Sequence, residues 1–133
     1  MLTRIVKKTL VFTFGGTGYC LIELLWRGHT HWTMYLTGGL CFFLIENLNR
    51  TVLLGKNLAA KCAAGAAVIT AVEFCSGCIV NLWLGMNVWD YRTLPMNLLG
   101  QISLMYSSLW YMLSAPIMGV AKLLDSRLKI EEA

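Results

Sequence analysis

Four long apolar segments, separated by short polar breaks, most limit what this chain can fold into. They cover residues 9–26, 32–48, 58–84 and 96–114. A helix needs about 20 apolar residues to cross the ~30 Å hydrocarbon core of a bilayer, and each segment reaches or approaches that length. Charged residues make up only 14% of the 133 residues, too few to cover a soluble domain of this size. We therefore predict an all-α integral membrane bundle of four transmembrane helices, forming a single transmembrane domain over residues 1–133.

The basic residues predict the orientation of this bundle. With four spans, nine of them fall on the side that holds both termini, namely Arg4, Lys7, Lys8, Arg50, Lys56, Lys61, Lys122, Arg127 and Lys129. Only Arg27 and Arg92 fall on the other side. Because Lys and Arg are concentrated in cytoplasmic loops, both termini are expected in the cytoplasm. The predicted location is the cell membrane, as a multi-pass protein surrounded by the lipid bilayer.

Pro116 interrupts the last apolar run. Beyond it, apolar residues recur at helical spacing with charged residues between them, at Ile117, Val120, Ala121, Leu124 and Leu128. This pattern favours an amphipathic helix over about 117–130 that lies on the inner leaflet. The alternative is that the fourth span continues through a kink at Pro116.

Glu73 is the ionisable residue deepest within an apolar segment. Thr70, Glu73, Gly77 and Asn81 follow i, i+3, i+7, i+11 spacing and so share one polar, small-residue face of a helix. An ionisable group in lipid costs about 3 kcal/mol or more, so this face is expected to point into the bundle and Glu73 to be functional. The alternative is that Glu73 makes a structural hydrogen bond between helices.

Other polar side chains fall near the first outer loop. Glu23 and Arg27 are spaced i, i+4 and are expected to pair. His29 and His31 could bind a metal only if a carboxylate such as Glu23 or Asp90 joined them. Interfacial hydrogen bonding is the favoured interpretation, and no metal site and no cofactor are assigned.

The second outer loop carries Asp90, and Pro95 suits the first turn of the predicted fourth helix. Asn97 and Gln101, at i, i+4, would then face one side near the outer mouth. Polar residues from separate spans thus converge on one membrane face, which favours a cavity. The predicted substrate-binding residues are Glu23, Arg27, His29, His31, Glu73, Asn81, Asp90, Asn97 and Gln101.

Two further local patterns concern helix packing. The pairs Gly15-Gly16 and Gly38-Gly39 are expected to allow close helix contact. Glu46 and Arg50, at i, i+4 near the inner end of the second segment, are expected to neutralise each other.

Several of these motifs occur together in one known family. They are the Gly28–Met34 stretch followed by Gly38-Gly39, then Glu73, Gly77 and Asn81, then Trp89-Asp90-Tyr91, Pro95, Asn97 and Gly100-Gln101. The combination resembles the putative ABC-transporter type IV permease family of small bacterial membrane proteins, over about residues 15–110. The resemblance implies a multi-pass protein related to transport, and it names no substrate.

The leading hypothesis is a permease-like component that binds or transports a small solute through a polar pocket open to the outer face. A membrane enzyme acting on a lipid headgroup and a structural or regulatory membrane protein are the alternatives, and no catalytic residue is assigned. Four short helices enclose little space, so a homo-oligomer or a partner membrane subunit is expected. The chain lacks G-x-x-x-x-G-K-[ST], so ATP-driven transport would need a separate ATPase. The scattered basic residues give no sign of nucleic-acid binding.

Overall fold

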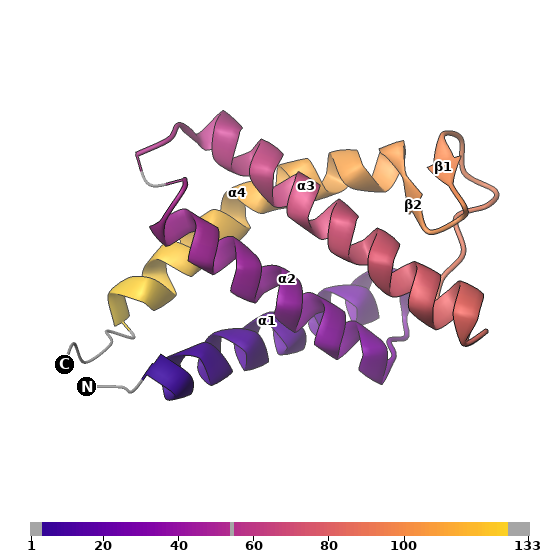
Figure 1. The fold of residues 1–133 in the computed structure, drawn as a ribbon, viewed down its shortest axis with the longest axis horizontal. Helices are drawn as coiled ribbons and strands as arrows, with labels where there is room; N and C mark the ends of the chain where they lie inside the picture. Colours follow the sequence, from indigo (N-terminus) through magenta and orange to yellow (C-terminus); the bar gives the residue numbers. More distant parts are fainter. Residues whose placement is uncertain (1–3, 54, 128–133) are drawn as a thin grey trace. The chain divides into compact units, whose positions relative to one another are not determined.

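The computed structural model describes residues 4–53 and 55–127, and this part of the chain is helical apart from loops and one short hairpin (Figure 1). Its elements are α1 (Arg4–Arg27), α2 (Trp32–Arg50), α3 (Leu58–Gly77), the π-helical turn η1 (Cys78–Trp83), β1 (Asn97–Leu98), β2 (Ile102–Ser103) and α4 (Leu104–Arg127). The predicted all-α class is therefore confirmed. The chain forms two compact units: a terminal unit of Met1–Lys56 with Pro116–Ala133, and a central unit of Asn57–Ala115.

Two of the described helices are long and apolar enough to cross a membrane, namely α1 and the continuous segment Leu58–Trp83. Large apolar side chains on them are exposed, including Ile5 at 78%, Leu25 at 89% and Trp83 at 78%. Exposed apolar surface of this extent on long helices suits contact with lipid rather than water. Both observations indicate a membrane protein.

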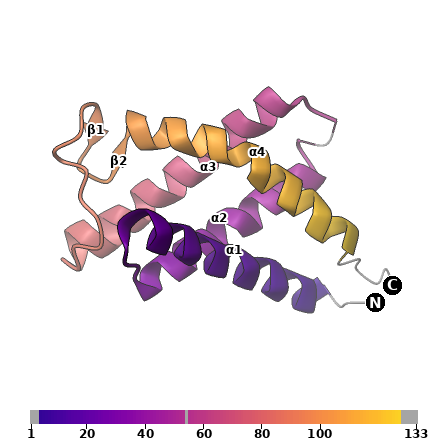
Figure 2. The ribbon, with the colours of Figure 1, turned by 180° about the vertical axis from the view of Figure 1, so that it is seen from behind.

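Helices α1 and α2 lie side by side in the terminal unit (Figure 2). Paired glycines allow this close contact. A Cβ atom on Gly15 would lie 2.3 Å from the Cβ of Phe42, and one on Gly38 would lie 2.3 Å from the Cβ of Tyr19. No larger residue fits at either position without moving the other helix. The prediction that these glycines allow close helix contact is confirmed.

The second half of α4 completes the terminal unit. Ala121 is fully buried and forms a small core with Val11 of α1 and Phe42 of α2. α4 runs without a break through Pro116, so the segment after the proline continues the helix before it. The end of the predicted surface helix, residues 128–130, lies outside the described residues, and a position on the inner leaflet stays a prediction.

The central unit contains α3, η1, the following loop, the hairpin and the first half of α4. Asn57 caps α3, because its side-chain oxygen accepts a hydrogen bond from the backbone N–H of Ala60 at 2.8 Å. At the other end the helix widens into η1, where the N–H of Leu84 donates to the carbonyl of Ile79 at 2.9 Å. The helical segment therefore runs close to the predicted 58–84.

The fourth helix begins at Leu104 rather than near residue 96, because a hairpin precedes it. Asn97 pairs with Ser103 across this hairpin. Its turn contains Leu99 and Gly100, both in the left-handed region with φ of 54° and 73°. The side chain of Asn97 accepts a hydrogen bond from the N–H of Gly100 at 3.1 Å and stabilises the turn. The prediction that Asn97 and Gln101 share a helix face is therefore wrong, as is the placement of Pro95 in the first helical turn.

Candidate functional site

Glu73 is the centre of the polar cluster in the central unit. The residue is only 3% exposed, on a helix that is otherwise largely apolar. Its Oε1 accepts a hydrogen bond from the hydroxyl of Tyr91 at 2.7 Å, and its Oε2 accepts one from Nε1 of Trp110 at 2.9 Å. Tyr91 lies in the loop after η1 and Trp110 lies on α4, so two separate segments orient this carboxyl.

Aromatic rings flank the carboxyl on one side. Tyr91 stacks on Tyr106 with ring centroids 4.6 Å apart and an interplanar angle of 9°, and Tyr106 lies 6.3 Å from Trp110. Sequence reasoning missed Tyr91 and Trp110 as partners of Glu73, and it missed Tyr106, which contacts both of their rings. One signal was available, since Tyr106 and Trp110 are spaced i, i+4 and Trp110 is the tryptophan that lies away from the outer loops.

Asn81 and Gln101 form a second buried polar pair in the same unit. The side-chain N–H of Asn81 donates to Oε1 of Gln101 at 2.8 Å, and Oδ1 of Asn81 accepts from the backbone N–H of Val88 at 2.7 Å. Nε1 of Trp89 donates to the backbone oxygen of Gln101 at 2.9 Å. A Cβ on Gly77 would lie 2.5 Å from Oε1 of Gln101, so this glycine lets the hairpin approach α3.

Thr70 extends the same face of α3 toward its N-terminal end. Its hydroxyl lies 2.8 Å from that of Ser107 on α4. The polar face predicted for α3 therefore points into the central unit along its whole length. An open, mainly apolar groove of about 420 Å³ lies beside it, lined by Ala66, Ala67, Thr70, Ala71, Phe74, Leu98, Ile102 and Ser107.

Asp90 and Asn97 organise the loop and the hairpin that follow η1 in the central unit. Asp90 is exposed and pairs with Arg92, whose Nη2 lies 2.7 Å from Oδ2 of Asp90. Hydrogen bonds from the Arg92 side chain lower the pKa of the Asp90 carboxyl below its usual value. The amide of Asn97 donates to the carbonyl of Leu94 at 2.8 Å. Asp90 thus pairs with the charged side chain of Arg92, and Asn97 holds the backbone of the loop.

The predicted site residues in and beside the loop between α1 and α2 belong to the terminal unit. Arg27 pairs with buried Glu23 at 3.1 Å, so this predicted ion pair is confirmed. Nδ1 of His31 accepts a hydrogen bond from the N–H of Thr33 at 3.2 Å and caps α2, which agrees with the hydrogen-bonding interpretation of this histidine. His29 is exposed in the loop between α1 and α2.

The nine predicted site residues are thus divided between the two units. Glu73, Asn81, Asp90, Asn97 and Gln101 belong to the central unit, and Glu23, Arg27, His29 and His31 belong to the terminal unit. A single pocket shared by all nine stays a prediction. Within residues 4–53 and 55–127, no three His, Cys, Asp or Glu side chains are grouped as metal ligands.

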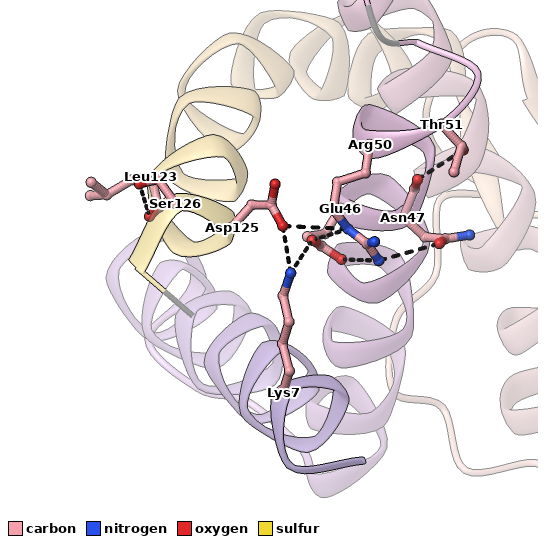
Figure 3. A network of polar contacts seen from close by, with 8 residues as sticks. All are labelled: Lys7, Glu46, Asn47, Arg50, Thr51, Leu123, Asp125 and Ser126. Carbon is pink, nitrogen blue, oxygen red and sulfur yellow. Dashed lines mark hydrogen bonds and ion pairs between the residues drawn. The ribbon is translucent and has the colours of Figure 1, made fainter. Parts of the chain in front are cut away.

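A charged network in the terminal unit was only half foreseen (Figure 3). Nε of Arg50 donates to Oε1 of Glu46 at 2.6 Å, which confirms the predicted pair. The structure adds Lys7 of α1, whose Nζ lies 3.6 Å from Glu46 and is hydrogen-bonded to Asp125 of α4. Lys7 and Glu46 are each 3% exposed. No spacing in the sequence relates Lys7 to Glu46 or Asp125, so no sequence signal existed for these contacts.

Comparison with curated proteins gives no match, and comparison with solved structures gives none either. A family model described as putative ABC-transporter type IV matches residues 11–131, which include nearly the whole of both units. The chain therefore belongs to the putative ABC-transporter type IV family.

Proposed function

We propose that this protein is the permease-like membrane component of an ABC-type transport system and that it binds or moves a small solute. Family membership supports the transport role, and the exposed apolar helices support the membrane location. The observation that carries the proposal is Glu73, a carboxyl within the apolar helix α3 that is held by Tyr91 and Trp110.

The energetic cost of this carboxyl supports a functional role for Glu73. Placing an ionisable group in the middle of a membrane helix costs about 3 kcal/mol or more. A hydroxyl could link two helices at lower cost, as Thr70 does with Ser107 of α4. An amide could likewise hold a loop, as Asn81 does with Gln101 of the hairpin. A carboxyl held at both oxygens is instead suited to exchange its partners for a solute. Tyr91 lies in a loop, so it is the donor better placed to move aside.

The full arrangement that we propose is a four-span, multi-pass protein of the cell membrane with both termini in the cytoplasm. The distribution of nine basic residues on one side and two on the other supports this orientation. In this arrangement the loop between α1 and α2 and the loop after η1 share one membrane face. Four short helices enclose little space, so we propose a homo-oligomer or a partner membrane subunit, together with a separate ATPase.

A purely structural role is the second candidate, and one observation favours it. Asn81 and Gln101 hydrogen-bond each other, so part of the polar face is satisfied within the unit. Under this proposal the buried polar groups of α3 only fix the packing of the loop and of α4. Their removal would then change stability and leave transport intact.

The test compares solute accumulation in cells that express the chain with cells that lack it, together with their native partner subunits. After a responding solute is identified, Glu73→Gln is expected to abolish the difference. Tyr91→Phe is expected to reduce it, and Tyr111→Phe serves as the matched control because Tyr111 is exposed on α4. Melting temperature and oligomeric state in detergent are measured in parallel. If Glu73→Gln lowers the melting temperature but leaves solute accumulation unchanged, the transport role of Glu73 is contradicted and the structural role is supported.

A further inference from the structure

Two successive lysines near the start of α1 have different surroundings. Lys7 is buried and paired with Glu46 and Asp125. Lys8 is exposed, and its Nζ lies 5.9 Å from the centre of the Phe43 ring on α2. Lys7 therefore forms ion pairs inside the protein, whereas the charge of Lys8 lies at the surface beside an aromatic side chain.

Lys8 lies on an open groove of about 390 Å³ between α1 and α2. The groove is lined by Lys8, Thr9, Phe12, Thr13, Leu40 and Phe43, all of the terminal unit. It is mainly apolar away from the lysine, and none of the described residues that line it is acidic. Gly39 of α2 allows the Phe12 ring of α1 to pack closely against α2, since a Cβ atom on Gly39 would lie 2.6 Å from that ring.

A second cation lies close to the same end of the groove. Arg4 precedes Lys8 by four residues on α1, so the two side chains share one helix face, and both residues are exposed. Like charges at this spacing repel each other, and an anion between them would offset the repulsion. Both residues also belong to the basic side of the chain, which is predicted to face the cytoplasm, where anionic lipids are concentrated.

We propose that this groove binds one anionic glycerophospholipid. Its phosphate lies against Lys8 and Arg4, and one acyl chain lies along Phe12, Leu40 and Phe43. Charge complementarity at one end and an apolar floor along the rest together select an anionic lipid over a zwitterionic one and over a soluble phosphate. The site does not involve the proposed solute centre around Glu73, and it rests on the membrane location and the cytoplasmic basic side given under the proposed function.

The experiment counts lipids retained by the purified full-length protein in detergent, by native mass spectrometry after incubation with defined lipid. Dioleoyl-phosphatidylglycerol is the probe and dioleoyl-phosphatidylcholine is the zwitterionic comparison. One phosphatidylglycerol is expected to remain bound, with phosphatidylcholine weaker. Lys8→Gln is expected to weaken retention about fivefold, the effect of one basic residue at an anionic membrane surface. Lys8→Arg is expected to retain the lipid.

Lys122→Gln is the matched control, because Lys122 is an exposed lysine of the same unit that does not line the groove. Glycerol 3-phosphate, which has the charge but no acyl chain, is expected not to displace the lipid. Equal retention of both lipids, an equal loss with Lys122→Gln, or displacement by glycerol 3-phosphate would each overturn the proposal. Because Lys8 is exposed, the Gln variant is expected to elute and melt like the original protein.

Discussion

Replacing Lys7 by Met is expected to destabilise the terminal unit. The substitution keeps the apolar stem and removes the charge that links α1 to Glu46 of α2 and to Asp125 of α4. Removing one partner of a fully buried ion pair costs about 3–5 kcal/mol. Two features reduce that value here, because Glu46 keeps Arg50 at 2.6 Å and the side chain of Asp125 is 40% exposed. We expect a loss of about 2 kcal/mol.

The assay is thermal unfolding of the purified protein in detergent. A loss of about 2 kcal/mol corresponds to a melting temperature lower by about 5–10 °C for a chain of this size. Lys8→Met is the matched control, since it removes an exposed charge from the next position and is expected to change the melting temperature little. The double variant Lys7→Met with Asp125→Asn is expected to recover part of the loss, because it leaves one fewer uncompensated charge.

Equal melting temperatures for Lys7→Met and Lys8→Met would refute this reasoning. That result would mean that the network in Figure 3 contributes no net stability, as occurs when the desolvation of buried charges cancels their attraction. If the double variant is no more stable than Lys7→Met alone, the loss of stability comes from the contact of Lys7 with Glu46 and not from its contact with Asp125.

Three further predictions concern packing, the buried amide pair and the outer loop. Gly38→Leu is expected to lower the free energy of unfolding by about 3 kcal/mol, because α2 must move away from α1. Gly18→Leu is the control and should be tolerated, because a Cβ atom there meets nothing within 4 Å among the described residues. Equal melting temperatures of the two variants in detergent would contradict this prediction. Gln101→Leu is expected to lower the free energy of unfolding by about 2 kcal/mol in the same assay, because it leaves the buried amide of Asn81 without its partner. A change below about 0.5 kcal/mol would argue that this pair contributes little to stability. Arg92→Gln is expected to raise the pKa of Asp90 toward its ordinary value, as measured by the chemical shift of the carboxyl carbon. In the original protein, any stability from this ion pair is present above the pKa of Asp90 in the unfolded state. It is lost as the pH falls through the lower pKa of the folded state.

Local patterns in the sequence predicted local features of the structure. The pairs Glu23–Arg27 and Glu46–Arg50 were foreseen because residues four apart on a helix are neighbours wherever the helix lies. The inward polar face of α3 was foreseen for a related reason, since helical periodicity places Thr70 through Asn81 on one side.

The hairpin could not be predicted from the apolar pattern. Its sequence, from Asn97 to Ser103, contains leucines and an isoleucine that suit a membrane helix equally well. What excludes the helix is the left-handed backbone at Leu99 and Gly100, which the side chain of Asn97 stabilises. Leucine seldom adopts that conformation, so it gave no warning of the turn.

The partners of Glu73 and Lys7 were missed because they are distant along the chain. Trp110 lies 37 residues from Glu73, and Asp125 lies 118 residues from Lys7. No spacing rule connects such residues, since their contact depends on how separate helices pack. The sequence nevertheless identified Glu73 itself, because the cost of an acid in an apolar segment does not depend on what surrounds it.

The wide turn η1 at the end of α3 makes the length of this segment and its rotational setting separate properties. A π-helical turn corresponds to one residue inserted into an α-helix. Deleting one residue from η1 would therefore convert the wide turn into an ordinary α-helical turn and shorten the segment by about 1.5 Å. Because the wide turn absorbs the extra residue, the side chains beyond it would keep their direction, whereas the same deletion within α3 would rotate them by about 100°. Homologous chains whose segments differ by one residue at this turn can thus present the same side chains to the hairpin.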